Sequence, residues 1–153
     1  MVDSLFEDDL VEEYIQWKKT NTNFSWWNYV NLRSDVDVAL AFSKFYCPDI
    51  IIIDNCFLLK DKYNKSIYDS WRIKCSNKTD IEKMMNLYEL EDFFHINQPL
   101  YNSNYSLKIR KLGEIIQYFW SLSFRERFKD REIIVDVFDQ YGDNYVTVYE
   151  KIE

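Results

Sequence analysis

The stretch IIVDVFDQYGDNYVTVYE, residues 133–150, carries the clearest structural signal in the chain. Its first half alternates Ile133, Val135 and Val137 with the side chains between them, and its second half alternates Tyr145, Thr147 and Tyr149 in the same way. A period of two is the pattern of a β-strand, and the polar segment 140–143 with its glycine lies between the two runs. The sequence therefore predicts a β-hairpin at the end of the chain.

The segment before this hairpin has the period of a helix. Ile109, Leu112, Ile116 and Phe119 recur at helical spacing, which predicts one long helix over residues 105–128. Three shorter helices are predicted towards the N-terminus: one along Phe6 to Trp17, one from Ser34 to the break at Pro48, and one that opens at residues 79–82. There, Thr79 and Glu82 have the spacing of a capping box. Residues 24–32 fit either a short helix or an aromatic-rich strand.

Two further segments have strand character. The aliphatic runs 50–53 and 56–59 form one strand, or two with a break at residues 54–55, and their continuous apolar character predicts burial on both faces. Trp71, Ile73 and Cys75 alternate with polar residues, which predicts a half-buried strand. The expected fold is α+β: about four helices packed on a small, mainly antiparallel sheet of about four strands, in a single globular domain over residues 1–153.

The composition limits the classes of function. The chain has only two glycines, and neither belongs to a glycine-rich loop, so we expect no nucleotide cofactor bound through such a loop and assign no other cofactor. The formal net charge is −7, which gives no general attraction for nucleic acid or anionic membranes. The charge is uneven, with six acids and no base in residues 1–13, and seven bases against three acids in residues 105–131.

The potential metal-binding and nucleophilic residues are few and scattered. Cys47, Cys56, Cys75 and His95 lie far apart in the sequence, so they lack the close pairs of a zinc site, and buried structural cysteine is the simpler interpretation. The odd cysteine count, an acidic start without signal-peptide features and the lack of a long apolar run predict a cytoplasmic protein that does not enter a membrane.

Two other patterns can be interpreted either as purely structural or as functional. Aromatic residues among the bases of residues 105–131 could grip single-stranded nucleic acid, but a core helix with a solvated basic face explains them better. Six aspartates could supply a carboxylate or metal site if the fold brings at least two of them into one pocket. They are Asp35, Asp37, Asp49, Asp54, Asp136 and Asp139. Asp143 could join the last two as a metal ligand beside the hairpin.

The densest aromatic cluster is Trp26, Trp27 and Tyr29. Adjacent tryptophans cannot both face one side of a regular element, so one packs inward and the other reaches the surface, where tryptophan and tyrosine often anchor protein interfaces. The alternative, which the sequence slightly favours, is that both are buried between elements. The candidate partner-binding residues are Trp26, Trp27, Tyr29 and the N-terminal acids Glu7, Asp8, Asp9 and Glu12.

Three hypotheses of function follow. The first is a non-enzymatic protein-binding module whose acidic face meets a basic partner, in the manner of a small inhibitor or immunity protein. The second is a small enzyme that uses the aspartates or an aspartate-bound metal. The third is a self-associating structural protein, such as a homodimer, joined through the aromatics or by contact between the acidic and the basic helices.

Overall fold

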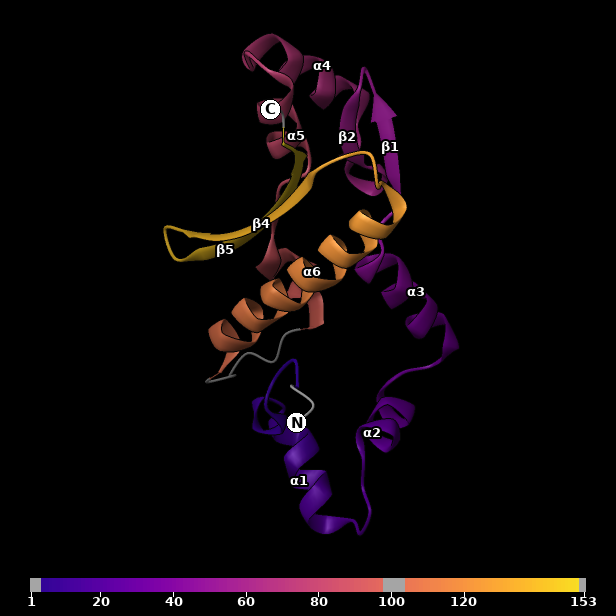
Figure 1. The fold of residues 1–153 in the computed structure, drawn as a ribbon. Coiled ribbons are helices and arrows are strands. Elements are labelled where there is room, and N and C mark those ends of the chain that lie inside the picture. The colour runs from indigo at the N-terminus through magenta and orange to yellow at the C-terminus, as the bar shows by residue number, and fades with distance from the viewer. Residues whose placement is uncertain (1–3, 98–103, 152–153) are drawn as a thin grey trace. The chain divides into compact units, whose positions relative to one another are not determined.

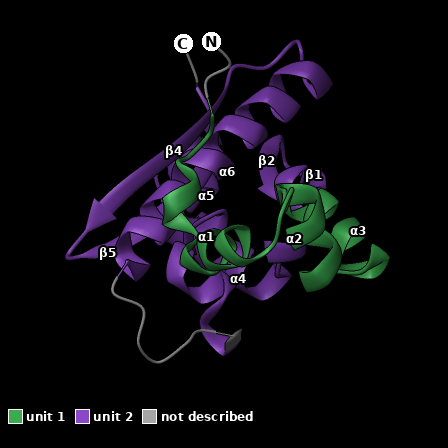
Figure 2. Ribbon diagram, turned by 90° about the horizontal axis from the view of Figure 1, so that it is seen from below, with its two compact units in different colours: residues 1–45 green, residues 46–153 purple. Residues whose placement is uncertain are grey.

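The computed structural model describes residues 4–97 and 104–151 of the chain (Figure 1). The elements follow in the order α1 (Glu12–Thr20), α2 (Trp26–Arg33), α3 (Val36–Tyr46), β1 (Ile50–Ile53), β2 (Cys56–Leu59), α4 (Lys65–Lys74), α5 (Lys78–Met85), β3 (Tyr88–Glu89), α6 (Tyr105–Arg127), β4 (Ile133–Gln140) and β5 (Asp143–Glu150). Short 3₁₀ turns lie at Asp8–Leu10, Lys60–Lys62, Leu90–Phe93 and His95–Asn97. The chain divides into two compact units, residues 1–45 (unit 1) and residues 46–153 (unit 2), which Figure 2 colours separately.

The α+β class and the C-terminal hairpin are confirmed. The expected counts are only roughly matched, because the described residues form six α-helices and two small antiparallel sheets, β1-β2 and β3-β5-β4. Residues 24–32, left open between helix and strand, contain most of α2. The predicted strand at Trp71–Cys75 is wrong, since α4 covers this segment up to Lys74 and leaves Ile73 88% exposed.

The segment forms the helix α4 because an N-cap and apolar residues at helical spacing outweigh the short strand-like alternation of Trp71, Ile73 and Cys75. The side chain of Asn64 accepts a hydrogen bond from the Ile67 N–H at 3.1 Å, which fixes the first turn. Tyr68, Trp71 and Cys75 then recur at helical spacing and pack in one cluster with Cys56 of β2. The apolar side chains that suggested a strand therefore meet the core from a helix.

Two tight turns close the hairpins. Asp54 and Asn55 have φ of 48° and 65°, and Tyr141 and Gly142 have φ of 58° and 97°. Positive φ at both central residues is the geometry that suits a two-residue hairpin loop. The first turn resolves residues 50–59 into two strands, with Ile50 paired to Leu59 and Ile53 to Cys56. The expected burial on both faces holds for β2, whose four residues are all buried, but not for the edge strand β1, where Ile52 is exposed.

The long helix α6 confirms the prediction over residues 105–128 to within one residue and packs against β4. Its buried side chains include Ile116 and Phe124, and the Phe124 ring lies edge-on to Phe57 of β2 at 5.3 Å between centroids. Gly113 leaves no room for a side chain, since a Cβ there would lie 2.7 Å from Leu90 Cδ1 and 3.0 Å from Val137 Cγ1. Helix α6 thus lies over both sheets of unit 2.

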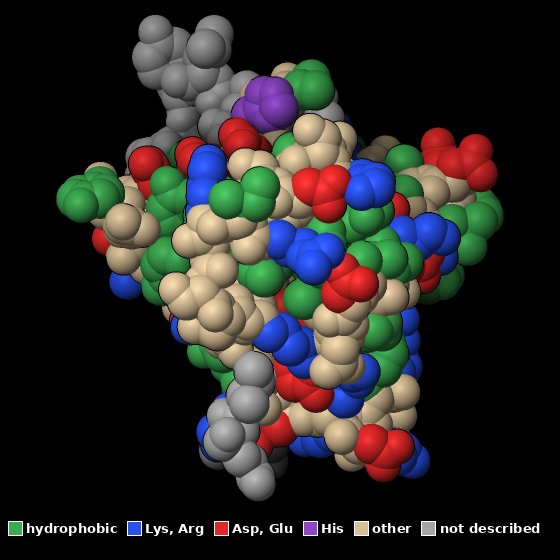
Figure 3. Space-filling view, turned by 90° about the horizontal axis from the view of Figure 1, so that it is seen from above, with side chains coloured by type: hydrophobic (Ala, Val, Ile, Leu, Met, Phe, Trp, Pro, Cys, Tyr) green, Lys and Arg blue, Asp and Glu red, His purple; other side chains and the backbone are tan. Residues whose placement is uncertain are grey.

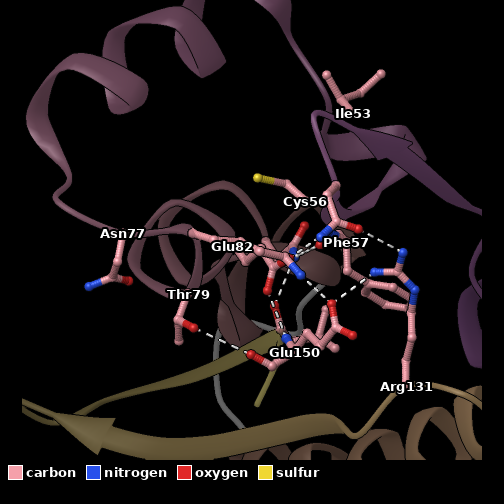
Figure 4. A network of polar contacts seen from close by, with 12 residues as sticks. Ile53, Cys56, Phe57, Asn77, Thr79, Glu82, Arg131 and Glu150 are labelled. Carbon is pink, nitrogen blue, oxygen red and sulfur yellow. Dashed lines mark hydrogen bonds and ion pairs between the residues drawn. The ribbon is translucent and has the colours of Figure 1, made fainter. Parts of the chain in front are cut away.

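The helix α5 joins the two sheets through two fully buried polar side chains (Figure 4). The Glu82 carboxylate accepts the Phe57 N–H of β2 at 2.6 Å and the Glu150 N–H of β5 at 2.7 Å. Asn86 accepts the Leu59 N–H at 2.8 Å and donates to the carbonyls of Phe57 at 2.7 Å and Val148 at 2.8 Å. The two side chains thereby hydrogen-bond to strand edges that no neighbouring strand covers within residues 4–97 and 104–151.

The predicted capping box at Thr79 and Glu82 is wrong, and the correction has a clear cause. Asn77 is the N-cap of α5: its side chain accepts the Asp80 N–H at 2.9 Å and donates to the Asp80 carboxylate at 2.8 Å. Glu82 is then one turn inside the helix and free to reach the strands, and Thr79 donates to the Glu150 carbonyl instead. Burial raises the pKa of Glu82, and the two N–H donors and Lys78 offset part of this rise.

We predict that Asn86→Asp lowers the free energy of unfolding by about 3 kcal/mol, because two buried carbonyls lose their donor and face a carboxylate instead. Urea unfolding followed by circular dichroism measures the change. Asn31→Asp, the same substitution at an exposed position of α2, is the matched control. A loss no larger than that of the control would show that Asn86 does not hold the strand edges together.

Candidate interaction surface

The core of unit 1 is a stack of aromatic rings from α1 and α2. Tyr14 is fully buried and lies parallel to Trp26, with 3.8 Å between ring centroids and 11° between planes. Tyr29 lies edge-on to both rings, and Phe24 packs beside Tyr14. Edge-on contacts are a favoured geometry of aromatic pairs, and together with the parallel Tyr14–Trp26 contact they hold α1 against α2.

Part of the predicted partner-binding set serves this core. The Trp26 indole donates to Asp8 Oδ1 at 2.7 Å, and the Tyr29 hydroxyl donates to Glu13 at 2.8 Å. Asp8 also pairs with Lys18 at 3.1 Å, and these two hydrogen bonds, that from Trp26 first, lower the pKa of the Asp8 carboxyl. Trp26, Tyr29 and Asp8 are therefore occupied inside unit 1.

Trp27 and the other acids face outward. Trp27 is 77% exposed, because a helix turns each residue by about 100° and so points it away from its buried neighbour. The structure thus places one tryptophan inward and the other outward, and corrects the slightly favoured expectation that both are buried. Glu7, Asp9 and Glu12 are also exposed.

Four other exposed apolar residues of α2 and α3 were not predicted from the sequence. Val30 and Leu32 of α2 are 51% and 60% exposed, and Val36 and Leu40 of α3 are 74% and 62% exposed. Neither helix contains a buried residue. We call these four residues and Trp27 the α2–α3 surface. Trp27 and Val30 share one face of α2, Val36 and Leu40 share one face of α3, and Leu32 lies on another side of α2. The detectable signal was the i, i+4 pair Val36 and Leu40, which shares one face of α3.

The charge of unit 1 is predominantly negative. Residues 1–45 contain eight acids and four bases, and two of the bases already form ion pairs, Lys18 with Asp8 and Arg33 with Glu13. Among the described residues, Glu7, Asp9 and Asp37 form no ion pair. Asp37 follows Val36 directly and so lies beside the α2–α3 surface. By contrast, Lys and Arg are interspersed with Asp and Glu on the face in Figure 3.

The structure also places the other candidate residues. Cys56 is buried, and burial raises the pKa of its thiol, which disfavours the nucleophilic thiolate. His95 is exposed, with Nδ1 at 2.7 Å from the Asp92 carbonyl oxygen. Over residues 4–97 and 104–151, no three His, Cys, Asp or Glu side chains lie where they could hold a metal ion together.

The candidate aspartates are distributed over several elements. Asp54 is in the β1–β2 turn and pairs with Arg72 at 2.9 Å, and Asp136 and Asp139 are on β4. Asp35 caps α3 by accepting the Val38 N–H at 2.9 Å, while Asp37 is in the first turn of that helix. Asp49 precedes β1, and Asp143 begins β5.

A group of acids that the sequence did not suggest lies near the hairpin. Burial, and then the charges of Asp92, Asp143 and Glu91, raise the pKa of Glu89. Glu91 accepts the side-chain amide of Asn144 at 3.0 Å, which fixes it against β5. These carboxylates come from the segment after α5 and from β5, so their proximity depends on the pairing of β3 with β5 and has no counterpart in the sequence spacing.

The neighbours Trp26 and Trp27 provide a matched pair of substitutions. We predict that Trp26→Ala lowers the stability of unit 1 by about 2–3 kcal/mol, because it removes the stack on Tyr14 and the partner of Asp8. Trp27→Ala changes it by less than about 0.5 kcal/mol. Hydrogen exchange of peptides from α1 and α2 measures both. Equal effects of the two substitutions would contradict the inward and outward assignment.

The comparisons with known proteins do not identify a function for the chain. No protein-family model matches the chain, and neither a curated protein nor a solved structure matches it. Within the part of the chain that the structure describes, no helix combines the length and the apolar character needed to cross a membrane.

Proposed function

We propose that the chain is a non-enzymatic protein-binding module, and that the α2–α3 surface binds a basic surface of a protein partner. The observation that carries this proposal is the exposure of five large apolar side chains on two helices that bury none of their residues. Single exposed apolar residues are ordinary, but grouped ones are characteristic of interaction sites. Trp27 is the natural anchor, because tryptophan is enriched among the residues that dominate binding energy.

The charge around this surface supports a basic partner. Unit 1 has twice as many acids as bases, and Asp37 beside Val36 is free of ion pairs among the described residues. Acidic groups at the rim of an apolar contact steer an oppositely charged partner and raise its association rate. They also disfavour acidic competitors, so the apolar residues supply affinity and the acids supply selectivity. An inhibitor of a basic protein would use such a surface.

Site-specific photo-crosslinking tests this proposal. A benzophenone amino acid replaces Trp27 in one variant and Val36 in another, and the chain is expressed in its own cells before irradiation. We expect both variants to give the same discrete crosslinked product, in which the partner is attached through a surface rich in Lys and Arg. The yield from lysates should fall as salt is raised, because screening weakens rim charges.

The matched control carries the same amino acid at Ile73, an exposed apolar position of α4 outside the α2–α3 surface. No product should form there. Equal crosslinking at positions 27, 36 and 73 would indicate non-specific contact. A lack of any product at positions 27 and 36 would contradict the proposed function.

A further inference from the structure

Helix α6 carries an exposed stripe of apolar and basic residues. Leu107, Tyr118 and Leu122 are 48%, 55% and 37% exposed. Arg110 and Arg125 are exposed and lie within the same sector of the helix, since residues three, four, seven and eight positions apart share a face. We call Leu107, Arg110, Tyr118, Leu122 and Arg125 the α6 stripe. The buried residue Ile116, which packs into unit 2, lies on the opposite side of the helix.

The charge of the α6 stripe is uncompensated. Arg110 and Arg125 have no hydrogen-bond or ion-pair partner among the described residues, and the nearby acid Glu114 is paired with Lys111. The helix α6 as a whole has five bases and two acids. The α6 stripe therefore combines apolar contact area with free guanidinium groups, and these are the properties that the proposed partner of the α2–α3 surface must have.

We infer that a second copy of this chain supplies such a partner: the α2–α3 surface of one copy docks on the α6 stripe of another. This inference rests on the proposed function, because it uses the same surface. Val36 and Leu40 match Tyr118 and Leu122 as apolar side chains at i, i+4 spacing, the spacing that meets in helix-on-helix packing. Asp37 beside the first pair and Arg125 beside the second have opposite charge.

The dimensions of the elements are compatible with this contact. The α6 stripe runs over 18 residue steps, or about 27 Å at about 1.5 Å per residue, and α3 with 11 residues spans about 16 Å. A stable complex buries about 800 Å² on each partner.

A charge exchange between the two surfaces tests this inference on the full chain. Sedimentation equilibrium measures the association of the wild type, of Asp37→Lys and of Arg125→Glu. We expect the wild type to associate and each single variant to associate about tenfold more weakly, because it places like charges together. An equimolar mixture of the two variants should recover much of the lost affinity, because the reversed charges then face each other.

Asp139→Lys, the same charge change at an exposed position of β4, is the control and should leave association unchanged. A wild type that stays monomeric at high concentration would overturn self-docking, as would association that none of the exchanges alters. Either result leaves the proposed function standing if Trp27 and Val36 crosslink to a different protein. Loss of those crosslinks together with an unaltered dimer would overturn both.

Discussion

The architecture of unit 2 depends on one arrangement of hydrogen bonds, in which a helix replaces a missing strand. Strands β2 and β5 each present an edge to the other, but α5 lies where a connecting strand would run. Glu82 accepts an N–H from each strand, and Asn86 both accepts and donates as a backbone peptide group would. Without these side chains, five backbone groups would lose their partners, and the four that are buried would cost about 1–3 kcal/mol each.

The contact of α5 with β2 and β5 also positions charged side chains around it. The Glu150 carboxylate at the end of β5 is held by Lys78 of α5 and by Arg131, 2.8 Å away, and Arg131 also donates to Asn55 in the β1–β2 turn at 3.0 Å. The same helix that bridges the strand edges thus brings a cation to the strand end. The two sheets are consequently linked at their edges by neutral and charged hydrogen bonds and over one face by α6.

The elements with long periodic patterns were predicted correctly from the sequence. The predictions were wrong where contacts with residues far away in the sequence determine the structure. The hairpin of β4 and β5 and the helix α6 have long periodic patterns, and both were predicted almost to the residue. The alternation Trp71, Ile73, Cys75 is too short to separate strand from helix, and the cap at Asn64 decided it. Glu82 has the spacing of a capping residue, and nothing local reveals that two strands 25 and 68 residues away need an acceptor.

The candidate interaction surface was likewise predicted only in part from the sequence. The sequence identified Trp27 as one of a pair that cannot both point inward, but it grouped Trp27 with Trp26, Tyr29 and Asp8, which the aromatic core of unit 1 uses. In the described part of unit 1, Tyr14 is the one buried hydrophobic side chain. So small a core cannot hide all the apolar residues of α2 and α3, because the buried fraction of a folded segment falls with its size. The apolar side chains of α2 and α3 are therefore exposed because the core of unit 1 is small. Their exposure also makes them available to a partner.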